Sequence, residues 1–497
     1  MPRKVSPTIA LCVVARKDEE HLIDECLASA RPFVDEVVVE FSSVDEVAAA
    51  RNAAVGAARA DWVLMLDAGE RLDPASGPDL RRLARRLPAG AHGYSFRLRR
   101  GRDVPIDELA ARFFLRRLGL VWRGEVHEEL VCEQAPESTV FVDAESDGVI
   151  HRVVARPLKE AHGLIEQALA RDPDDVRLRY YLGESHLRDG QPREAAACFK
   201  TCLLTPDRLP RPLLVDAFAT WLEALITLGD VRNIERVARR GEAAQALSPA
   251  AREMLADYNE RRGRLTEARR QLVLALDPRV SPFGLVRPEG VGGWRTRLHL
   301  ALVDEQLGLV EQALQDLSRA TDELPDEHQF NVAVLGARIA ARRGASVARP
   351  WFERAAACAP DSLDAHAALL ELRLAIPELI DTTTDDSFSA LDRDLANQDW
   401  QAAYDAAMRL PLEDLAALAR VLYLAGCLRE RGAADAALDL LDRALDAHPR
   451  TRPVYWLLTS VLIDLDRYAD AQIALEVLQL LGREAAQLPE LQSALAA

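Results

Sequence analysis

Short apolar runs alternate with helical patterns along the first third of the chain. Residues 8–15 are apolar throughout, as in a strand that is buried on both faces. Carboxylates at Asp18 and Glu20 favour a helix start, and Ser42 and Ser43 are candidate caps for the next helix. Strands are predicted at 8–15, 35–40, 62–66 and 92–98, and helices at 18–27, 48–54 and 80–87. This β-α-β-α-β order predicts a mainly parallel, three-layer α/β domain over residues 1–155.

After residue 156 the pattern changes to helix pairs that repeat. Ala313 and Ala348 are 35 residues apart, and Ala437 and Ala471 are 34 apart. A small residue at a helix crossing, a large apolar residue one turn later and a proline at the helix end recur with this spacing. The matching sets are Leu182-Gly183, Ala195, Phe199 and Pro206; Leu300-Ala301, Ala313, Leu317 and Pro325; Leu335-Gly336, Ala348, Phe352 and Pro360; Leu424-Ala425, Ala437, Leu441 and Pro449; and Leu458, Ala471 and Leu475. The pattern resembles tetratricopeptide (TPR) repeats, which implies an all-α solenoid.

A glycine-rich segment interrupts the repeats at residues 277–294. Insertions in a solenoid often lie on one face and carry binding, but this segment equally suits a plain connector. The expected domains are therefore 1–155, 156–280, and 281–497 after the inserted loop. A chain of 497 residues is long enough for about three domains.

Composition narrows the classes of function. A net charge of −17 argues against nucleic acid as the main partner, and 49% hydrophobic residues are enough for packed cores. The longest apolar run near the start is too short for a transmembrane segment. Seven scattered cysteines without a C-x-x-C pair predict reduced thiols, and hence a cytoplasmic protein.

The third predicted strand ends in acidic residues, at Asp67 and Glu70. Ligands of open α/β sheets bind at the carboxyl ends of the strands. Carboxylates there are suitable ligands for a divalent cation that neutralises a phosphate. The strand end is therefore a candidate catalytic site.

Seven motifs in order resemble a bacterial family 2 glycosyltransferase of the GT-A fold that is followed by TPR repeats. They are Ala15-Arg-Lys-Asp-Glu-Glu20, Asp35-Glu-Val-Val-Val-Glu40 with the following Phe41 to Asp45, Ala49-Ala-Arg51-Asn52, Asp61-Trp-Val-Leu-Met-Leu-Asp67-Ala-Gly-Glu70, Arg112-Phe-Phe-Leu-Arg-Arg, Trp122-Arg-Gly-Glu-Val-His127-Glu128, and His151. The resemblance implies transfer of a sugar from a nucleotide-sugar donor to an acceptor, such as a peptide or protein held in a TPR groove.

The resemblance also implies roles for single residues. The catalytic residues would be Asp67 and Glu128, with Glu128 as base for the acceptor. Asp67, Glu70 and His127 would hold a Mg²⁺ or Mn²⁺ ion. The nucleotide-sugar would be bound by Asp18, Glu20, Glu40 and Arg51, and the candidate phosphate contacts are Arg51, Arg97 and Arg123.

Each assignment has a simpler alternative. Asp18 and Glu20 suit a helix N-terminus, Glu40 suits the surface, and His127 suits an apolar core.

Two departures from the family pattern leave two functions open. The second aspartate of the family's D-x-D motif is Gly69 here, and an extra helix and edge strand are missing between Asp45 and Ala49. One hypothesis is a working glycosyltransferase, with Glu70 and His127 carrying the cation or with donor binding that needs no metal. The other is a degenerate GT-A domain in a non-catalytic TPR scaffold or protein-interaction module.

Overall fold

The computed structural model describes residues 6–43, 46–100, 106–124, 126–134, 138–144, 147–153, 158–380 and 387–481. The chain divides into two compact units, Met1–Val303 and Asp304–Ala497. The first unit contains the β-sheet and the first helix pairs, and the only regular elements in the described residues of the second unit are helices. Of the helices in the described residues, none combines the length and the apolar character that crossing a membrane requires.

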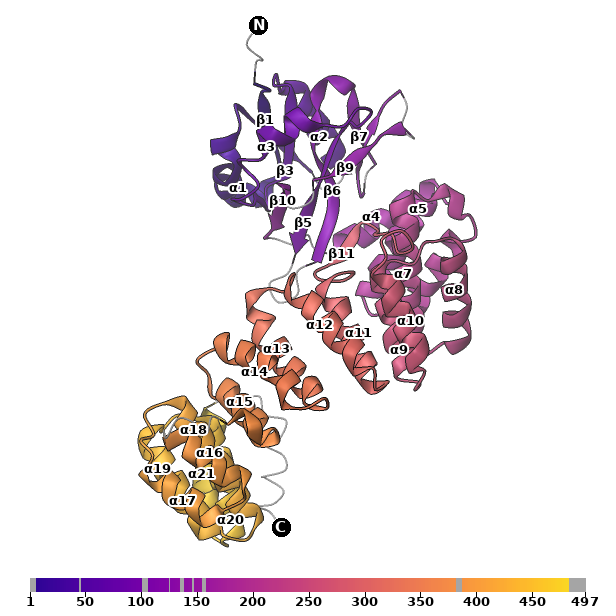
Figure 1. Cartoon of the computed structure of the whole chain (residues 1–497). Coiled ribbons are helices and arrows are strands. Elements are labelled where there is room, and N and C mark those ends of the chain that lie inside the picture. The colour runs from indigo at the N-terminus through magenta and orange to yellow at the C-terminus, as the bar shows by residue number, and fades with distance from the viewer. Residues whose placement is uncertain are drawn as a thin grey trace, which may run out of the picture. The chain divides into compact units, whose positions relative to one another are not determined.

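One mixed sheet organises the start of the first unit. Within the described residues it has nine strands, in the order β2-β1-β3-β6-β5-β10-β4, with β9 paired to β5 and β11 paired to β6. Figure 1 shows β1, β3, β6 and β5 side by side. A separate antiparallel pair is formed by β7 and β8. The strands are β1 Ile9–Arg16, β2 Glu36–Ser42, β3 Trp62–Asp67, β4 Glu70–Leu72, β5 Gly93–Arg100, β6 Ile106–Leu115, β7 Leu120–Arg123, β8 Glu129–Cys132, β9 Phe141–Asp143, β10 Val149–Arg152 and β11 Val286–Pro288.

Helices cover both faces of the sheet, so the predicted three layers are present. Alternate residues of β1 point to opposite faces. On one face β1 packs with α1 and α3, and on the other it packs with α2. These helices are α1 Ile23–Ala30, α2 Val47–Ala57 and α3 Leu80–Arg86, and a short 3-10 helix, η1 Lys17–Leu22, precedes α1.

The expectation of a mainly parallel sheet is corrected. β1 is parallel to β2 and β3, but β6 runs antiparallel to both β3 and β5. Five residues separate β5 from β6, and a parallel crossover needs a dozen or more. Ser42 and Ser43 do not cap α2 either, because Ser42 ends β2 and the Ser43 hydroxyl donates to Glu46.

After the sheet, the rest of the first unit and the second unit are built of helices (Figure 1). In the first unit they are α4 Leu158–Arg171, α5 Val176–Arg188, α6 Pro192–Cys202, α7 Arg211–Leu228, α8 Val231–Ala243, α9 Pro249–Glu260, α10 Leu265–Ala275 and α11 Trp294–Gln306. The second unit contains α12 Val310–Thr321, α13 Asp326–Ala341, α14 Ala345–Ala357, α15 Leu363–Ala375, α16 Ser387–Ala396, α17 Trp400–Arg409, α18 Leu415–Glu430, α19 Ala434–Ala447, α20 Arg452–Asp464 and α21 Tyr468–Leu480. The boundary between the units falls inside α11.

Close crossings explain the small residues of the repeat. A Cβ added to Gly183 would lie 2.7 Å from the Phe199 ring, and one added to Gly336 would lie 2.2 Å from the Trp351 ring. Both glycines therefore let a neighbouring helix approach closely. Ala195, the small residue one helix later, is likewise buried. The predicted repeat positions thus face the helix contacts.

The inserted segment joins the helices to the sheet. Its strand β11 pairs antiparallel with β6, and the Leu109 N–H donates to the Leu285 carbonyl at 2.9 Å. Arg287 of β11 also forms an ion pair with Asp143 of β9. The segment is therefore a structural part of the first unit. Of the predicted domain limits, residues 155 and 156 lie outside the described residues, and the limits stay predictions.

Candidate functional site

Two predicted site residues lie side by side at the end of β3. Asp67 is the last residue of β3 and Glu70 is the first of β4, so a tight turn separates them. Their exposed fractions are 8% and 1%. The Asp67 N–H donates to the Glu70 carboxylate at 3.0 Å, which fixes the turn. The strand end thus buries two carboxylates.

Arg51 of α2 connects these carboxylates to Glu128. One guanidinium nitrogen donates to Asp67 at 2.8 Å and the other donates to Glu128 at 3.1 Å. The guanidinium also lies over the Trp122 ring, 4.5 Å from its centroid. Arg51 is only 3% exposed, so the surrounding residues hold it in place. Three residues with predicted roles therefore meet in one network.

Two further arginines neutralise Glu70. Arg112 of β6 donates to Glu70 at 3.1 Å and lies 3.9 Å from Asp67, and Arg152 of β10 donates to Glu70 at 2.8 Å. Burial by itself would raise the pKa of Glu70, but the charges of Arg112 and Arg152 hold this pKa below its usual value. We call Arg51, Arg112, Arg152, Asp67, Glu70 and Glu128 the arginine–carboxylate cluster.

The cluster does not fit a divalent cation as it is arranged. Three guanidinium groups already face its three carboxylates, so the formal charges balance. A cation would have to displace at least one arginine from a buried ion pair. A buried arginine that has lost its carboxylate partner strongly destabilises the folded state. The predicted metal role of Asp67 and Glu70 stays a prediction.

His127 contacts an aromatic residue of the helix α5. Its ring stacks on Tyr181 of α5, with centroids 3.6 Å apart and planes 1° apart. The backbone of His127 is left-handed, with φ of 53°. Close by, Arg177 of α5 forms an ion pair with Glu129 of β8. Both contacts hold the β7–β8 pair against α5.

One group of three possible metal ligands gathers elsewhere in the described residues. It consists of Asp257 and Glu260 on α9 and His299 on α11, whose ligand atoms all lie within 4.8 Å of one another. The imidazole nitrogen of His299 is 3.1 Å from Glu260 and 3.5 Å from Asp257. Asp67, Glu70 and His127 do not form such a group.

The predicted nucleotide contacts other than Arg51 lie at or just beyond the carboxyl ends of β1 and β2, where Val14 of β1 is level with both Glu40 of β2 and Asp67 of β3. Asp18 lies in η1, where Arg16 donates to its carboxylate at 2.9 Å; this hydrogen bond lowers the pKa of Asp18. Glu20 is exposed in η1, and Glu40 is half-buried on β2.

The predicted phosphate contacts other than Arg51 lie on β5 and at the end of β7. Arg97 of β5 lies 4.0 Å from Asp143, and Arg123 is exposed at the end of β7. Asp45 and Glu125, which belong to the motifs, lie outside the described residues.

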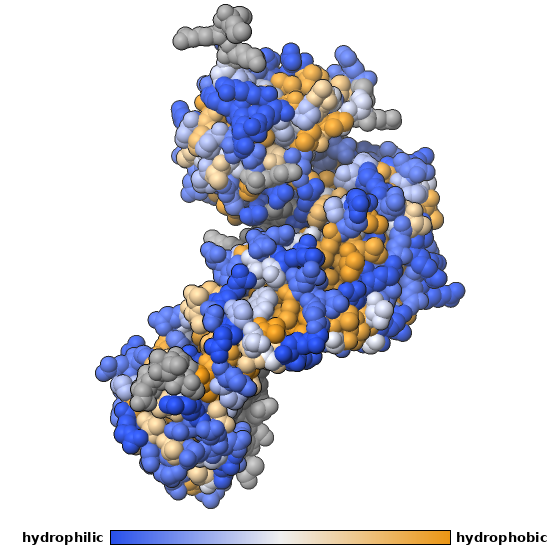
Figure 2. Space-filling model, viewed as in Figure 1, coloured by the Kyte–Doolittle hydropathy of each residue, from blue (hydrophilic) through white to orange (hydrophobic). Residues whose placement is uncertain are grey.

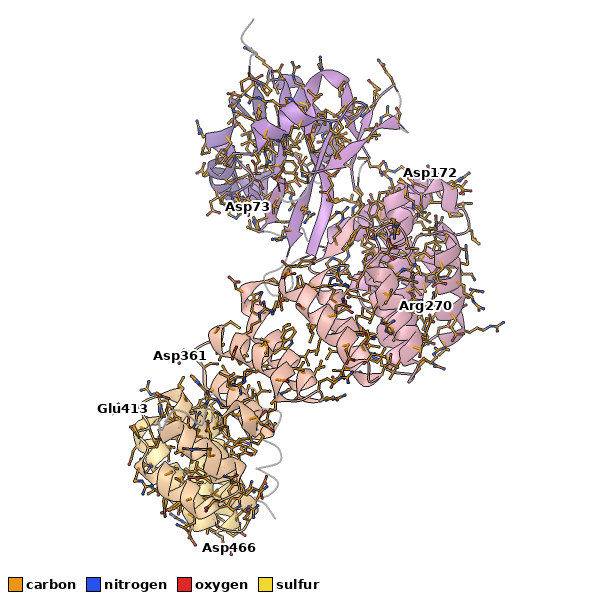
Figure 3. All side chains as sticks on the ribbon, in the orientation of Figure 1. Asp73, Asp172, Arg270, Asp361, Glu413 and Asp466 are labelled. Carbon is orange, nitrogen blue, oxygen red and sulfur yellow. The ribbon has the colours of Figure 1, made fainter. Side chains whose placement is uncertain are left out.

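Sequence reasoning missed the role of two arginines. Arg112 interrupts an apolar run in β6, and an arginine inside such a run is a signal of a buried ion pair. Arg152 follows His151 without any such signal. His151 itself bonds Asp73, labelled in Figure 3, at 2.7 Å.

A groove in the second unit is a second candidate site. It has a volume of about 900 Å³ and lies between α12 and α14. Its lining combines apolar and polar side chains. Figure 2 shows apolar areas among polar ones on the face in view. We call it the α12–α14 groove, and it is lined by Glu311, Gln312, Leu314, Gln315, Ser318, Val347, Pro350, Trp351 and Arg354.

Known proteins are similar to part of the chain. No protein-family model matches the chain. A TPR repeat-containing protein of Synechococcus elongatus is 28% identical over 225 residues, which cover 39% of this chain and 55% of that protein. The cellulose synthase operon protein C of Pseudomonas fluorescens is 30% identical over 174 residues, which cover 34% of this chain and 13% of that protein. The chain thus spans about half or less of the length of these relatives.

Among solved structures, the C-terminal part of a TPR repeat-containing protein from Cytophaga hutchinsonii is 13% identical. The matched region covers 51% of this chain and 92% of the solved chain. Its TM-score of 0.37 is too low to support an argument. The repeat spacing, the helix pairs and the sequence relatives agree with one another. The helical part of the chain is an array of helix pairs that is similar to TPR repeats.

Proposed function

We propose that the chain is a protein-interaction scaffold whose TPR-type repeats bind a peptide segment of a partner protein. In this proposal the N-terminal domain is a degenerate GT-A domain without transferase activity. The observation that carries the proposal is the contrast between the two candidate sites. The arginine–carboxylate cluster is buried and neutralised, whereas the α12–α14 groove is open at the surface.

The chemistry of the groove suits a peptide. Val347 is 39% exposed, and it lies in the lining with Leu314, Pro350 and Trp351. These side chains provide an apolar floor for one or two hydrophobic side chains of a ligand. Glutamine and serine side chains on α12 provide donors and acceptors for the backbone of an extended or helical peptide.

Contacts within the second unit hold the lining residues of the groove in place. Arg354 donates to Thr321 at 2.9 Å and lies over the Trp351 ring, 6.0 Å from its centroid. Trp351 packs against Gly336, and Glu311 forms an ion pair with Arg343. A preformed groove loses little conformational entropy when a ligand binds, which favours affinity.

Selection from a random peptide library on the immobilised full chain tests the scaffold proposal. We expect enriched peptides that bind the wild type and bind Val347→Asp at least about tenfold more weakly, a loss of about 1.4 kcal/mol. Val273→Asp is the matched control, because Val273 is 43% exposed on α10, outside the groove. No enriched peptide, or equal binding to Val347→Asp and the wild type, would contradict the proposal.

A glycosyltransferase is the second candidate. One observation favours it: Asp67, Arg51 and Glu128, which the resemblance implies as site residues, meet in one network at the carboxyl end of β3. Activity would require donor binding without a metal, or displacement of an arginine when donor and cation bind together.

Calorimetry of nucleoside diphosphates, with and without Mn²⁺, separates the two candidates. The scaffold proposal predicts no binding heat for any of them. Binding that Asp67→Asn abolishes, while the melting temperature of that variant stays close to wild type, would favour the transferase.

A further inference from the structure

The strand β2 forms one end of the main sheet. Its inner side pairs with β1 over seven residues, from Glu36 to Ser42. Among the described residues, no strand pairs with its outer side. The strand at the opposite end of the sheet order, β4, has only three residues. A long strand with a free edge presents unpaired backbone N–H and C=O groups, which are a template for another strand.

Exposed apolar side chains accompany this free edge. Val37 is 36% exposed and Phe41 is 49% exposed. Residues four apart on a strand lie on the same face, so these two side chains form one apolar stripe with Val39 between them. Val39 packs partly against the core beneath α1. Exposed apolar side chains on an edge strand are unusual, since edges are commonly protected by charge or proline.

We propose that β2 is a self-association edge, at which a second copy of this chain adds its own β2 antiparallel to the first. The sequence of the strand, Glu36-Val-Val-Val-Glu40-Phe-Ser42, is self-complementary about Val39. In this register Val37 faces Phe41 of the second copy, and Val39 faces itself across a two-fold axis. The two exposed apolar side chains of each copy are then covered by those of the other.

The charges of the strand select this register. Centring the pair on Val38 would place Glu36 opposite Glu40, and centring it on Glu40 would place two Glu40 side chains opposite each other. Like charges directly opposite are destabilising, whereas an aromatic side chain opposite a β-branched one stabilises the pair. Centred on Val39, Glu40 faces Val38 and Glu36 faces Ser42, so no glutamate faces another.

A second copy is the occupant that this edge fits. Self-complementarity of one patch is the requirement of an isologous two-fold interface, in which each contact occurs twice. Two joined strands make the sheets of both copies continuous and remove the free edge of each. The proposal is independent of the proposed scaffold function, because it concerns the sheet and not the helical groove.

Analytical ultracentrifugation of the full chain, from micromolar to several hundred micromolar, tests this edge. We expect a monomer–dimer equilibrium that Phe41→Lys weakens about tenfold or more, because a charged side chain would face the apolar stripe. Val140→Lys is the matched control, since Val140 is also 49% exposed but precedes β9, and it leaves the equilibrium unchanged. A monomer at every concentration, or a dimer that Phe41→Lys leaves intact, overturns the proposal.

Cross-linking tests the register and remains informative if Phe41→Lys fails to fold. Val39→Cys places two thiols opposite each other at the two-fold axis, so a short bismaleimide should join two chains. Phe41→Cys places its thiol opposite Val37, and it should cross-link much less in the same background of seven native cysteines. Equal cross-linking of the two variants would contradict the register.

Discussion

Glu70 and Asp216 are both buried carboxylates of the first unit, but their surroundings differ in one respect. Glu70 has two arginine partners, and their charges hold its pKa below the usual value although burial opposes this. Asp216 on α7 accepts a hydrogen bond from the Leu285 N–H at 2.7 Å, and burial raises its pKa to about 7. Burial alone therefore does not decide the charge of a carboxylate here; the partner does.

This comparison assigns different tasks to the two regions. The arginine–carboxylate cluster keeps buried charges at the end of β3 and joins α2, β6 and β10 around them. Asp216 holds the segment that leads into β11, so it fastens the inserted strand to the helices. Each arrangement predicts a different response to mutation and to pH.

The largest effect is expected from removing one arginine of the cluster. Arg112→Leu leaves Glu70 and Asp67 with less compensating charge, and breaking a buried pair costs about 3–5 kcal/mol of the free energy of unfolding. Urea denaturation followed by circular dichroism measures it. Arg279→Leu is the control, because Arg279 pairs with Asp277 at the exposed surface, and its denaturation midpoint should match wild type. A midpoint for Arg112→Leu close to that of the control would break the comparison.

The pH dependence of Asp216 comes next. Its pKa is about 7 in the folded protein, whereas an aspartate in water has an ordinary pKa of 3.8, so the folded state favours the protonated form. The free energy of unfolding should therefore fall as pH rises from about 4 to about 7, by up to about 1.4 kcal/mol per pH unit, and then level off.

Asp216→Asn isolates this contribution, because the amide does not titrate. Between pH 5 and pH 8 the wild type should lose unfolding free energy relative to the variant. A difference that stays constant over this range would show that Asp216 titrates normally.

A smaller effect is expected at the helix crossings. A Cβ at Gly336 would lie 2.2 Å from the Trp351 ring, so Gly336→Ala should destabilise the second unit by about 1–3 kcal/mol. A Cβ added to Gly426 on α18 would meet no atom within 4 Å. Gly426→Ala should therefore stabilise the second unit by about 0.5–1 kcal/mol. Thermal denaturation of the two variants checks the opposite signs, and equal signs would show that the crossing tolerates a methyl group.

The smallest effect concerns His127. His127→Asn keeps a side chain that tolerates the left-handed backbone but loses the stack on Tyr181. Stacked aromatic pairs contribute about 0.5–1.5 kcal/mol, so a loss of that size is expected in urea denaturation. An unchanged midpoint would show that this stack does not stabilise the first unit.

Much of the fold follows from local sequence patterns. The apolar runs predict β1 and β3 because strands buried on both faces have no polar positions. The repeat register is readable because a close crossing admits only glycine or alanine, as at Gly183 and Ala195. The short strand β11 has no such signal, because three residues are too few to show a period.

The sequence does not show which residues pair at the candidate site, for a different reason. Asp67 and Glu70 are visible as acids after an apolar strand, but Arg112 and Arg152 come from strands 42 and 82 residues after Glu70. Only the fold brings these charges together. The mixed direction of the sheet also depends on a hairpin that the apolar runs do not reveal.

The most direct test of the account is a crystal structure of the full chain soaked with Mn²⁺ and a nucleoside diphosphate. We predict that Arg51 still contacts Asp67, that Arg112 and Arg152 still contact Glu70, and that the anomalous difference map shows no manganese at these carboxylates. A manganese peak at coordination distance from Asp67, with an arginine displaced, would contradict the claim that the cluster is a neutralised structural site.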